Sequence, residues 1–326
     1  MTLCVLVTGG AGFIGVGLVE RLLSEGHRVV VLDDFSRGQR EHLAHLAEHE
    51  GLVIVEGDVC HAEDLETCHA AFGQIDLIHH LAAINGTKWF HEAAMRVIDV
   101  NINGTLQAIR KAQAWGARIV IASSPEAFGD DENMPLKSNN SSSFPSAHDH
   151  QRFSYGASKY LDEVALQHAV LHGLDGRIVR PFNGYGHRMV GDAYGQVVGM
   201  MFQAVKERGV ITVHGDGQQT RSFTHLDDLV DGIFLAGALD TGLDGESLRG
   251  ASFNIGSTEE ISMLDLAHAI NATVGSQAVD IVLAGGYPGD SKRRLPDCTS
   301  AAERLGWRAK VSLEEGLRRM WAALQP

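Results

Sequence analysis

Apolar residues gather along this chain in short runs, and most of the runs are separated by stretches with the three- to four-residue spacing of a helix. The predicted strands are Leu3–Thr8, Arg28–Asp33, Leu52–Glu56, Leu77–Leu81, Arg118–Ala122 and Gly176–Arg180. Strands that alternate with helices in this way predict an α/β fold with a doubly wound parallel sheet. In such sheets, ligands bind outside the carboxyl ends of the strands. The residues that follow the predicted strands are therefore the candidate site.

The turn after the first predicted strand is rich in glycine. It reads Thr8-Gly9-Gly10-Ala11-Gly12-Phe13-Ile14-Gly15 and leads into a helical pattern. Gly9 permits a tight turn, Gly12 lets the backbone approach a pyrophosphate, and Gly15 lets the helix lie close to the strand. The phosphates then face free N–H groups at a helix N-terminus. This spacing predicts a bound dinucleotide.

The second predicted strand ends in Asp33. A carboxylate in this place can accept a hydrogen bond from an adenosine ribose 2′-hydroxyl, and it repels a 2′-phosphate. Asp33 therefore favours NAD over NADP. Arg37, in the turn just beyond, argues in the opposite direction, because an arginine nearby can accommodate that phosphate.

A tyrosine and a lysine one helical turn apart form a second constellation. Tyr155 and Lys159 are four residues apart at the start of a helical pattern, which places both on one helical face. A phenol has an unperturbed pKa near ~10, but a nearby ammonium favours the phenolate, so the pair can act as a general base. Ser124, at the end of a predicted strand, would hydrogen-bond the oxygen that is deprotonated. Its neighbour Ser123 is the rival for that role.

Composition limits the remaining choices. The chain has 326 residues, 44% of them hydrophobic, and no apolar run approaches the ~18 residues of a membrane helix. No signal peptide is visible after Met1, so we expect a cytoplasmic protein. A net charge of −14 disfavours nucleic acid and anionic membranes as partners. The four cysteines have no metal-type spacing, so we expect reduced thiols and no metal site.

Together these motifs resemble the extended short-chain dehydrogenase/reductase family, specifically its NAD-dependent nucleotide-sugar epimerases, dehydratases and decarboxylases. The resemblance runs from Val5 to about Leu317. Besides the glycine turn and the Tyr155 to Lys159 segment, it rests on Gly57-Asp58-Val59, His80-Leu81-Ala82-Ala83, Asn101-Ile102-Asn103-Gly104-Thr105, Ser123 to Gly129, Arg180 to Gly186, Gly215 to Phe223, Phe253-Asn254-Ile255-Gly256 and Arg294-Leu295-Pro296-Asp297. It implies an enzyme; a noncatalytic dinucleotide-sensing scaffold is the alternative, against which the intact Ser124, Tyr155 and Lys159 argue.

The resemblance implies further roles on the cofactor side. Asp58 would contact the adenine, Leu81 and Ala83 would lie along the nicotinamide ribose, and Lys159 would contact both that ribose and Tyr155. The implied NAD site comprises Gly9, Gly12, Phe13, Ile14, Gly15, Asp33, Asp58, Val59, Leu81, Ala83, Tyr155 and Lys159.

The resemblance also implies a nucleotide-diphosphate sugar as substrate. Asn183 and Arg221 would hold its diphosphate or base, with Arg294 as a further phosphate ligand, since guanidinium groups match phosphate oxygens. Lys88, in the turn after Ala83, lies where the sugar is expected to enter and could touch a substrate oxygen; a packing loop is the alternative. Ser124 completes the substrate-binding set.

The segment Ser124-Pro125-Glu126 bears on the reaction. The dehydratases that this chain resembles place Asp-Glu, or a small polar residue and Glu, after the Ser/Thr, whereas Pro125 carries no acid. Glu126 is a candidate catalytic residue that keeps UDP-glucuronate decarboxylation open, and Arg152 resembles an arginine of some decarboxylases that could meet a uronate carboxylate. Plain 4-epimerases need only Tyr, Ser and room for a 4-keto intermediate to turn over. We predict an NAD-dependent 4-epimerase first, a UDP-glucuronate decarboxylase second and a 4,6-dehydratase third.

The predicted enzyme has two interleaved parts. An NAD-binding Rossmann domain covers residues 1–181, and a return segment at about 226–256 also belongs to it. A smaller nucleotide-sugar domain covers residues 182–326. The family resemblance implies a homodimer through a four-helix interface, to which a stripe of Val97, Ile98, Ile102, Leu106 and Ile109 could contribute; the same stripe would equally serve the internal core. The polar patch from Lys137 to Ser146 predicts a mobile loop, either over the site or simply on the surface.

Overall fold

A seven-stranded parallel sheet is the largest element of the computed structural model, which describes residues 2–148, 153–189, 196–286 and 291–325. The strand order is β11-β6-β5-β4-β1-β2-β3. The strands are β1 (Cys4–Thr8), β2 (Arg28–Asp33), β3 (Leu52–Glu56), β4 (Leu77–His80), β5 (Arg118–Ala122), β6 (Gly176–Pro181) and β11 (Ser252–Ile255). The predicted doubly wound α/β fold is confirmed, and each of the six predicted strands agrees within one residue at either end.

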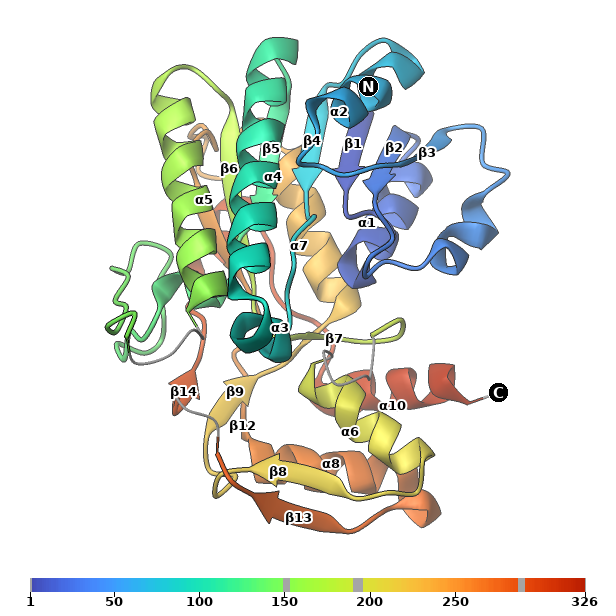
Figure 1. The fold of residues 1–326 in the computed structure, drawn as a ribbon, viewed down its shortest axis with the longest axis vertical. Coiled ribbons are helices and arrows are strands. Elements are labelled where there is room, and N and C mark those ends of the chain that lie inside the picture. Colours follow the sequence, from blue (N-terminus) through green and yellow to red (C-terminus); the bar gives the residue numbers. More distant parts are fainter. Residues whose placement is uncertain (1, 149–152, 190–195, 287–290, 326) are drawn as a thin grey trace.

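Helices cover both faces of this sheet (Figure 1). α1 (Phe13–Ser24) and α7 (Leu226–Ala238) pack on one face, and α2 (Ala62–Phe72), α4 (Ala94–Trp115) and α5 (Ser154–Leu171) pack on the other. Neighbouring residues of a strand point to opposite faces. Leu6 of β1 therefore belongs to the core beneath α2, α4 and α5, whereas Val7 belongs to the core beneath α1 and α7.

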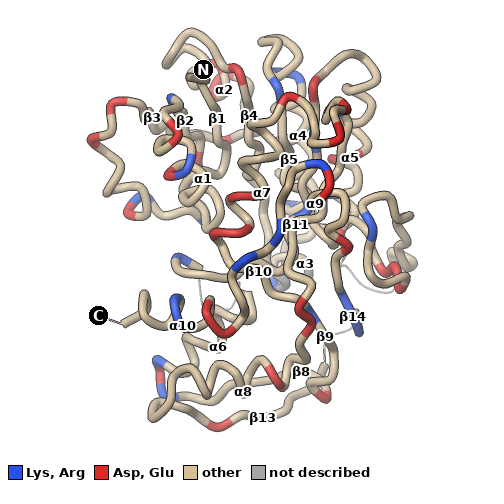
Figure 2. Tube along the Cα trace, turned by 180° about the vertical axis from the view of Figure 1, so that it is seen from behind, with Lys and Arg blue, Asp and Glu red and all other residues tan. Residues whose placement is uncertain are grey.

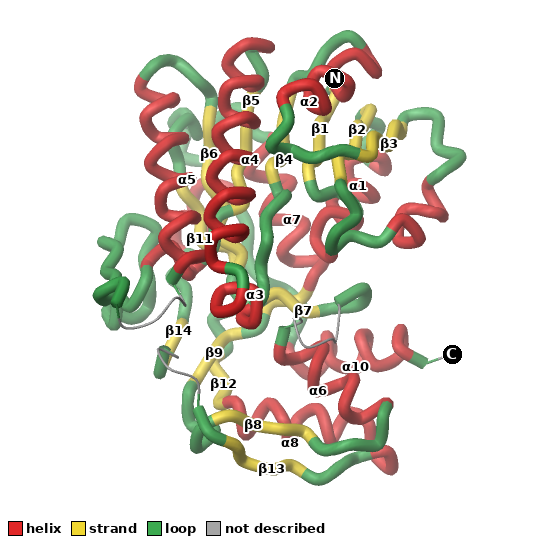
Figure 3. Tube along the Cα trace, in the orientation of Figure 1, coloured by secondary structure: helices red, strands yellow, loops and turns green. Residues whose placement is uncertain are grey.

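The smaller part lies beyond the carboxyl ends of the sheet strands. Its helices α6 (Val197–Lys206), α8 (Met263–Val274) and α10 (Leu313–Leu324) enclose a third core that contains Phe202 and Leu266. Its strands are short and pair in small sheets of the order β10-β7, β12-β9-β14 and β13-β8, most of which can be followed in Figure 3. They are β7 (Gly184–Tyr185), β8 (Ile211–His214), β9 (Thr220–Ser222), β10 (Thr224–His225), β12 (Glu260–Ser262), β13 (Ile281–Ala284) and β14 (Arg293–Arg294).

The chain passes between the two parts repeatedly. α7 and β11 lie with the large sheet, and so does α9 (Thr299–Leu305), whose Ala301 and Leu305 join the core beneath α1 and α7. The domain boundary at residue 181 stays a prediction. The remaining elements are the single-turn or 3₁₀ segments η1 (Arg40–Leu46), α3 (Thr87–Glu92), η2 (Pro125–Phe128) and η3 (Gly275–Gln277).

Hydrogen bonds fasten the described part of the loop that was predicted to be mobile. The Ser143 N–H donates to the Phe128 carbonyl at 3.1 Å, and Arg180 Nη1 donates to the Ser138 carbonyl at 3.0 Å. Arg152 lies outside the described residues. Acidic and basic segments are interspersed over both parts of the molecule (Figure 2). None of the helices in the described ranges is long and apolar enough to span a bilayer.

Candidate active site

A cavity of about 1450 Å³ opens between the carboxyl edge of the large sheet and the smaller part. A pocket for one drug-sized ligand typically measures about 300–1,000 Å³, so this cavity has room for two such molecules. All the residues predicted for the cofactor line it: Gly9, Gly12, Phe13, Ile14, Gly15, Asp33, Asp58, Val59, Leu81, Ala83, Tyr155 and Lys159.

The glycine turn shapes one end of the cavity. Gly9 has a φ of +71°, and a Cβ added to Gly15 would lie 2.1 Å from the Gly9 carbonyl oxygen. α1 begins directly after Gly12, which offers no side-chain acceptor to the first N–H groups of the helix. Those N–H groups are available to an anion at the positive end of the helix dipole. The turn therefore fits the pyrophosphate of a dinucleotide.

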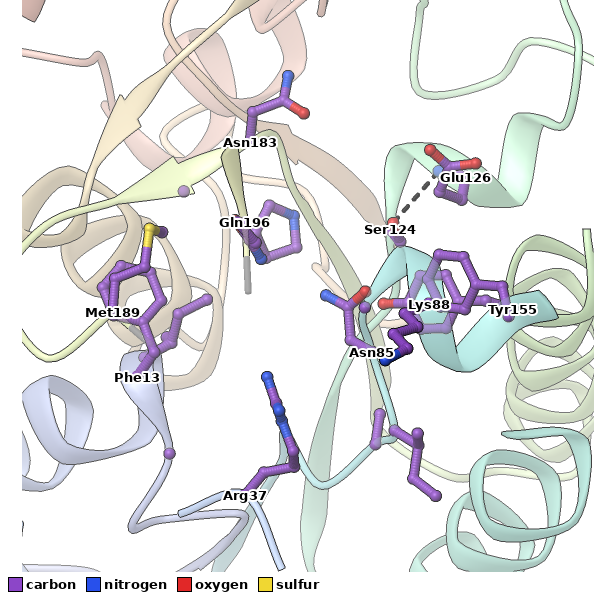
Figure 4. Close-up of a pocket in the computed structure, with 18 of the residues that line it drawn as sticks. Phe13, Arg37, Asn85, Lys88, Ser124, Glu126, Tyr155, Asn183, Met189 and Gln196 are labelled. Carbon is purple, nitrogen blue, oxygen red and sulfur yellow. Dashed lines mark hydrogen bonds between the residues drawn. The ribbon is translucent and has the colours of Figure 1, made fainter. Parts of the chain in front are cut away.

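The Asp33 carboxylate is fixed by the backbone around it. Its Oδ2 accepts a hydrogen bond from the Ala11 N–H and its Oδ1 accepts one from the Phe35 N–H, both at 2.9 Å. Burial raises the pKa of Asp33, and these two hydrogen bonds oppose that effect. A carboxylate in this position suits a ribose diol better than a phosphate. Arg37 also points into the cavity (Figure 4).

Ser124, Tyr155 and Lys159 meet at the centre of the cavity. The Ser124 hydroxyl hydrogen-bonds Tyr155 and also accepts from the Glu126 N–H at 3.2 Å, so that it caps η2 (Figure 4). The Tyr155 ring stacks on Phe90 with centroids 4.9 Å apart, and Lys159 Nζ lies 6.0 Å from the Tyr155 centroid. Burial raises the pKa of the Tyr155 phenol, and the hydrogen bond with Ser124 partly offsets it.

The neighbouring Ser123 is engaged elsewhere. Its Oγ donates to Glu163 Oε1 at 2.5 Å, and the same carboxylate accepts two hydrogen bonds from Arg180, at 2.6 and 2.7 Å. These three residues are buried or nearly so. The structure therefore places Ser124, and not its rival, next to the tyrosine.

Three of the residues predicted for the substrate line the cavity on the side of the smaller part and of α3. Asn183 has a φ of +36°, and its Nδ2 donates to the Ser222 carbonyl at 2.8 Å. Arg221 Nη1 donates to the Thr220 carbonyl at 2.7 Å. Lys88 Nζ lies 3.8 Å from Glu92. Their contacts with a substrate stay predictions.

The Arg294 side chain lies against Glu126 and does not line the cavity, where a phosphate ligand is expected. Its side chain is buried, and its Nη1 lies 3.1 Å from Glu126 Oε1. Its Nη2 donates to the Gly129 carbonyl and to Ser291 Oγ, at 3.2 and 2.7 Å. Glu126 lines the cavity, whereas Arg294 is not among its lining residues. Charge attraction thus directs this guanidinium to the carboxylate of Glu126, and phosphate binding by Arg294 stays a prediction.

Several lining residues carry no role in the sequence analysis: Asn85, Glu92, Arg96, Met189, Gln196 and Thr212. Asn85 follows a recognised motif by two residues, so its position could have been inferred. Gln196 and Thr212 belong to no motif, and only the packing of α6 and β8 brings them to the cavity. Within the described ranges, no group of three His, Cys, Asp or Glu residues is placed to hold a metal ion.

Comparison with known proteins decides the family. The NAD dependent epimerase/dehydratase family matches residues 5–256. The chain belongs to this family. It is an enzyme of the NAD-dependent epimerase/dehydratase group, and its cofactor is NAD, in agreement with the glycine turn and Asp33.

Similar proteins and structures match nearly the whole length of this chain. UDP-glucuronic acid decarboxylase 1 of Arabidopsis thaliana is 33% identical over 316 residues, which are 97% of this chain and 68% of that protein. UDP-N-acetyl-alpha-D-glucosaminuronate decarboxylase of Bacillus cytotoxicus is 31% identical over 318 residues, 96% of this chain and 95% of that protein. The crystal structure of UDP-glucose 4-epimerase from Thermotoga maritima with UDP-glucose has a TM-score of 0.88 at 27% identity, and 98% of each chain is covered.

Proposed function

We propose that this family member decarboxylates a UDP-hexuronate, such as UDP-glucuronate, through a 4-keto intermediate. The observation that carries the proposal is the Glu126 carboxylate in the cavity, held 3.1 Å from the buried guanidinium of Arg294 and adjacent to Ser124. The two relatives from Arabidopsis and Bacillus, both decarboxylases of UDP-uronates by name, support it.

The first task is to oxidise C4 of the sugar. Tyr155 takes the proton of the 4-hydroxyl, and the Lys159 ammonium favours the phenolate that can do so. Ser124 hydrogen-bonds both the phenol and the oxygen that loses its proton. When bound, NAD accepts hydride from C4 and later returns it.

The second task arises only with a uronate. A ketone at C4 makes the carboxylate on C5 a β-keto acid, so the C5–C6 bond can break with loss of CO₂. The electron pair moves to the C4 oxygen, where Ser124 and Tyr155 can stabilise the negative charge. C5 must then receive a proton. Glu126 can orient the water that delivers it, while Arg294 balances the charge of Glu126.

Epimerisation at C4 is the second candidate, and the sequence analysis placed it first. The likeness to the Thermotoga UDP-glucose 4-epimerase favours it, and it requires the serine, tyrosine and lysine alone. We place decarboxylation first because a cavity carboxylate that is paired with a buried guanidinium beside Ser124 has a task in that reaction and none in epimerisation. Dehydration stays third, because Pro125 supplies no acid.

The position of isotope in the product tests the proposal. The protein is incubated with UDP-glucuronate in D₂O, and the products are analysed by NMR together with CO₂ release. A decarboxylase releases CO₂ and places deuterium on C5 of the UDP-pentose, because that carbon is protonated from solvent. A 4-epimerised product without CO₂ and without deuterium at C5 would refute decarboxylation and establish the second candidate.

A matched pair of variants tests Glu126. Glu126→Gln keeps the shape and removes the charge, and we expect turnover to fall by ~10²-fold, the low end for loss of a proton-transfer group. Glu132→Gln makes the same change at an exposed position six residues along and should keep near-normal turnover. Equal rates for the two variants would contradict the role given to Glu126.

We also infer a homodimer, with an interface that shares Ile98 with the predicted stripe but leaves out Val97 and Ile109. Val97 and Ile109 of that stripe are buried within the subunit, with exposed fractions of 0% and 4%. The apolar side chains that do face outward on α4 and α5 are Met95, Ile98, Tyr160, Leu161, Val164 and Leu171. Light scattering at micromolar concentration should give the mass of two chains, and the mass of one chain would contradict the dimer.

A further inference from the structure

Asp162 takes no part in the chemistry described so far, yet it is buried beside the lysine of the site. It lies on α5 three residues after Lys159, and its Oδ2 is 3.3 Å from Lys159 Nζ. The exposed fractions of the two side chains are 2% and 3%. Opposite charges this close and this far from water interact strongly. The Lys159 charge that favours the Tyr155 phenolate is therefore shared with a second anion.

A series of buried hydrogen bonds connects the glycine turn with Thr105, which lies beside Asp162. Thr8 Oγ1 lies 2.9 Å from His80 Nδ1, and His80 Nε2 lies 3.0 Å from Thr105 Oγ1. Thr105 in turn lowers the pKa of the Asp162 carboxyl. β1, β4 and α4 each supply one residue of the series. Asp162 therefore lies between a hydrogen-bonded part of the core and Lys159, its hydrogen-bond partner.

The protonation of the series has a preferred direction. Burial lowers the pKa of His80 to about 3, so its imidazole is neutral, with one N–H donor and one acceptor nitrogen. Thr8 Oγ1 accepts from the Ala82 N–H at 3.3 Å, which leaves its own hydrogen for His80 Nδ1. His80 then donates from Nε2 to Thr105, which keeps its own hydrogen to donate. Beside it, the Oδ1 of Asp162 is buried and has no hydrogen-bond partner among the described residues.

We propose that Asp162 is a positioning residue that holds Lys159 and offsets part of its charge, and so sets the pH range in which Tyr155 works as the base. The inference rests on the Tyr155–Lys159 base of the proposed function, and it is independent of whether the sugar is decarboxylated or epimerised. Removal of the Asp162 charge leaves the ammonium uncompensated, which favours the phenolate at lower pH.

Other charged groups around this set have partners of their own. Glu163 on α5 is paired with Arg180 of β6, and Glu126 of η2 is paired with Arg294 of β14. His80 of β4 is neutral, and α4 contributes the uncharged Thr105. Burial raises the pKa of Asp162, and the adjacent Lys159 ammonium opposes this by favouring the carboxylate.

The test compares Asp162→Asn with the wild type in two ways, using the purified protein with its NAD. One readout is the ultraviolet absorbance of tyrosinate against pH, from which the titration of Tyr155→Phe is subtracted. The other is the pH profile of kcat/KM with whichever sugar nucleotide is converted. We expect the Tyr155 ionisation and the acidic limb of the profile both to move down by about one pH unit. The tyrosinate readout needs no substrate, so it stands even if UDP-glucuronate is not decarboxylated.

Control variants separate charge from structure. Asp162→Glu keeps the charge and should keep the wild-type profile even where kcat falls. Asp280→Asn removes the same charge from an exposed position in the smaller part and should change neither readout. If Asp162→Asn does not fold, the smaller Asp162→Ser should give the same downward shift. An unchanged Tyr155 titration and an unchanged acidic limb, with only a lower kcat, would overturn the proposal.

Discussion

The two sides of the cavity are built in different ways. The cofactor side is made largely of backbone: consecutive residues from Gly9 to Gly15 form the turn, and Asp33 follows from the adjacent strand. The sugar side is made of side chains from distant segments, such as Lys88, Glu126 and Arg221. A site made of backbone can be recognised from a short motif, whereas a site made of side chains takes shape only when the chain has folded.

The largest expected effect separates the chemistry from cofactor binding. Tyr155→Phe keeps the ring that stacks on Phe90 and removes the hydroxyl that takes the proton. Turnover should fall by at least ~10²-fold, the usual cost of losing a general base. Bound NAD, measured in the purified protein, should stay near the wild-type level. Near-normal turnover would remove Tyr155 from the mechanism.

At the glycine turn, we expect a substitution to affect NAD binding and stability rather than the chemistry. A Cβ at Gly15 would lie 2.1 Å from the Gly9 carbonyl oxygen, so Gly15→Ala must displace backbone. The free energy of unfolding should fall by about 1–3 kcal/mol, the usual cost of overpacking, with loss of bound NAD. Gly285→Ala is the control, because no atom lies within 4 Å of its added Cβ. Denaturant unfolding that gave equal stability for the two variants would contradict the close packing.

The adjacent residues Ser123 and Ser124 allow an effect on turnover to be compared with an effect on stability. Ser124→Ala removes a hydrogen bond to Tyr155 and should lower turnover by roughly tenfold or more, with little change in stability. Ser123→Ala leaves Glu163 with one donor fewer and should lower the free energy of unfolding by about 1–2 kcal/mol. Kinetics and denaturant unfolding of both variants check this assignment, and the reverse pattern would make Ser123 the partner of the tyrosine.

The smallest effect concerns the choice of cofactor. Asp33→Ala removes the carboxylate that is held at 2.9 Å by the Ala11 and Phe35 N–H groups. NAD binding should weaken by about tenfold relative to NADP, because one charge-assisted hydrogen bond and one repulsion are lost together. The ratio of the two dissociation constants measures this. A ratio equal to that of the wild type would leave Arg37 as the residue that decides.

The sequence predicted most of the fold and the cofactor side of the cavity, because short apolar runs and a glycine motif can be recognised before the chain folds. Six strands of four to six residues, five of them largely buried, stand out as apolar runs, and the glycine turn carries its geometry in its composition. The two-residue strands β7, β10 and β14 are too short to show any periodicity. Arg294 was predicted as a phosphate ligand because a guanidinium suits any anion, and only the tertiary fold shows that its partner is Glu126. Asp162 was missed although Lys159 lies only three residues before it, because only the fold shows that both side chains are buried.

Hydrogen bonds to β11 hold the segment that follows Arg294 in place. Asn254 of β11 donates from Nδ2 to the carbonyls of Leu136 and Asp297, and the Asp297 N–H donates to the Leu136 carbonyl. The segment that carries Arg294 is thereby hydrogen-bonded to the edge strand of the large sheet. Arg294 is thereby fixed in place, and its ion pair holds Glu126 beside Ser124. We expect any adjustment to a bound substrate on the other side of the cavity, which α6 and β8 line.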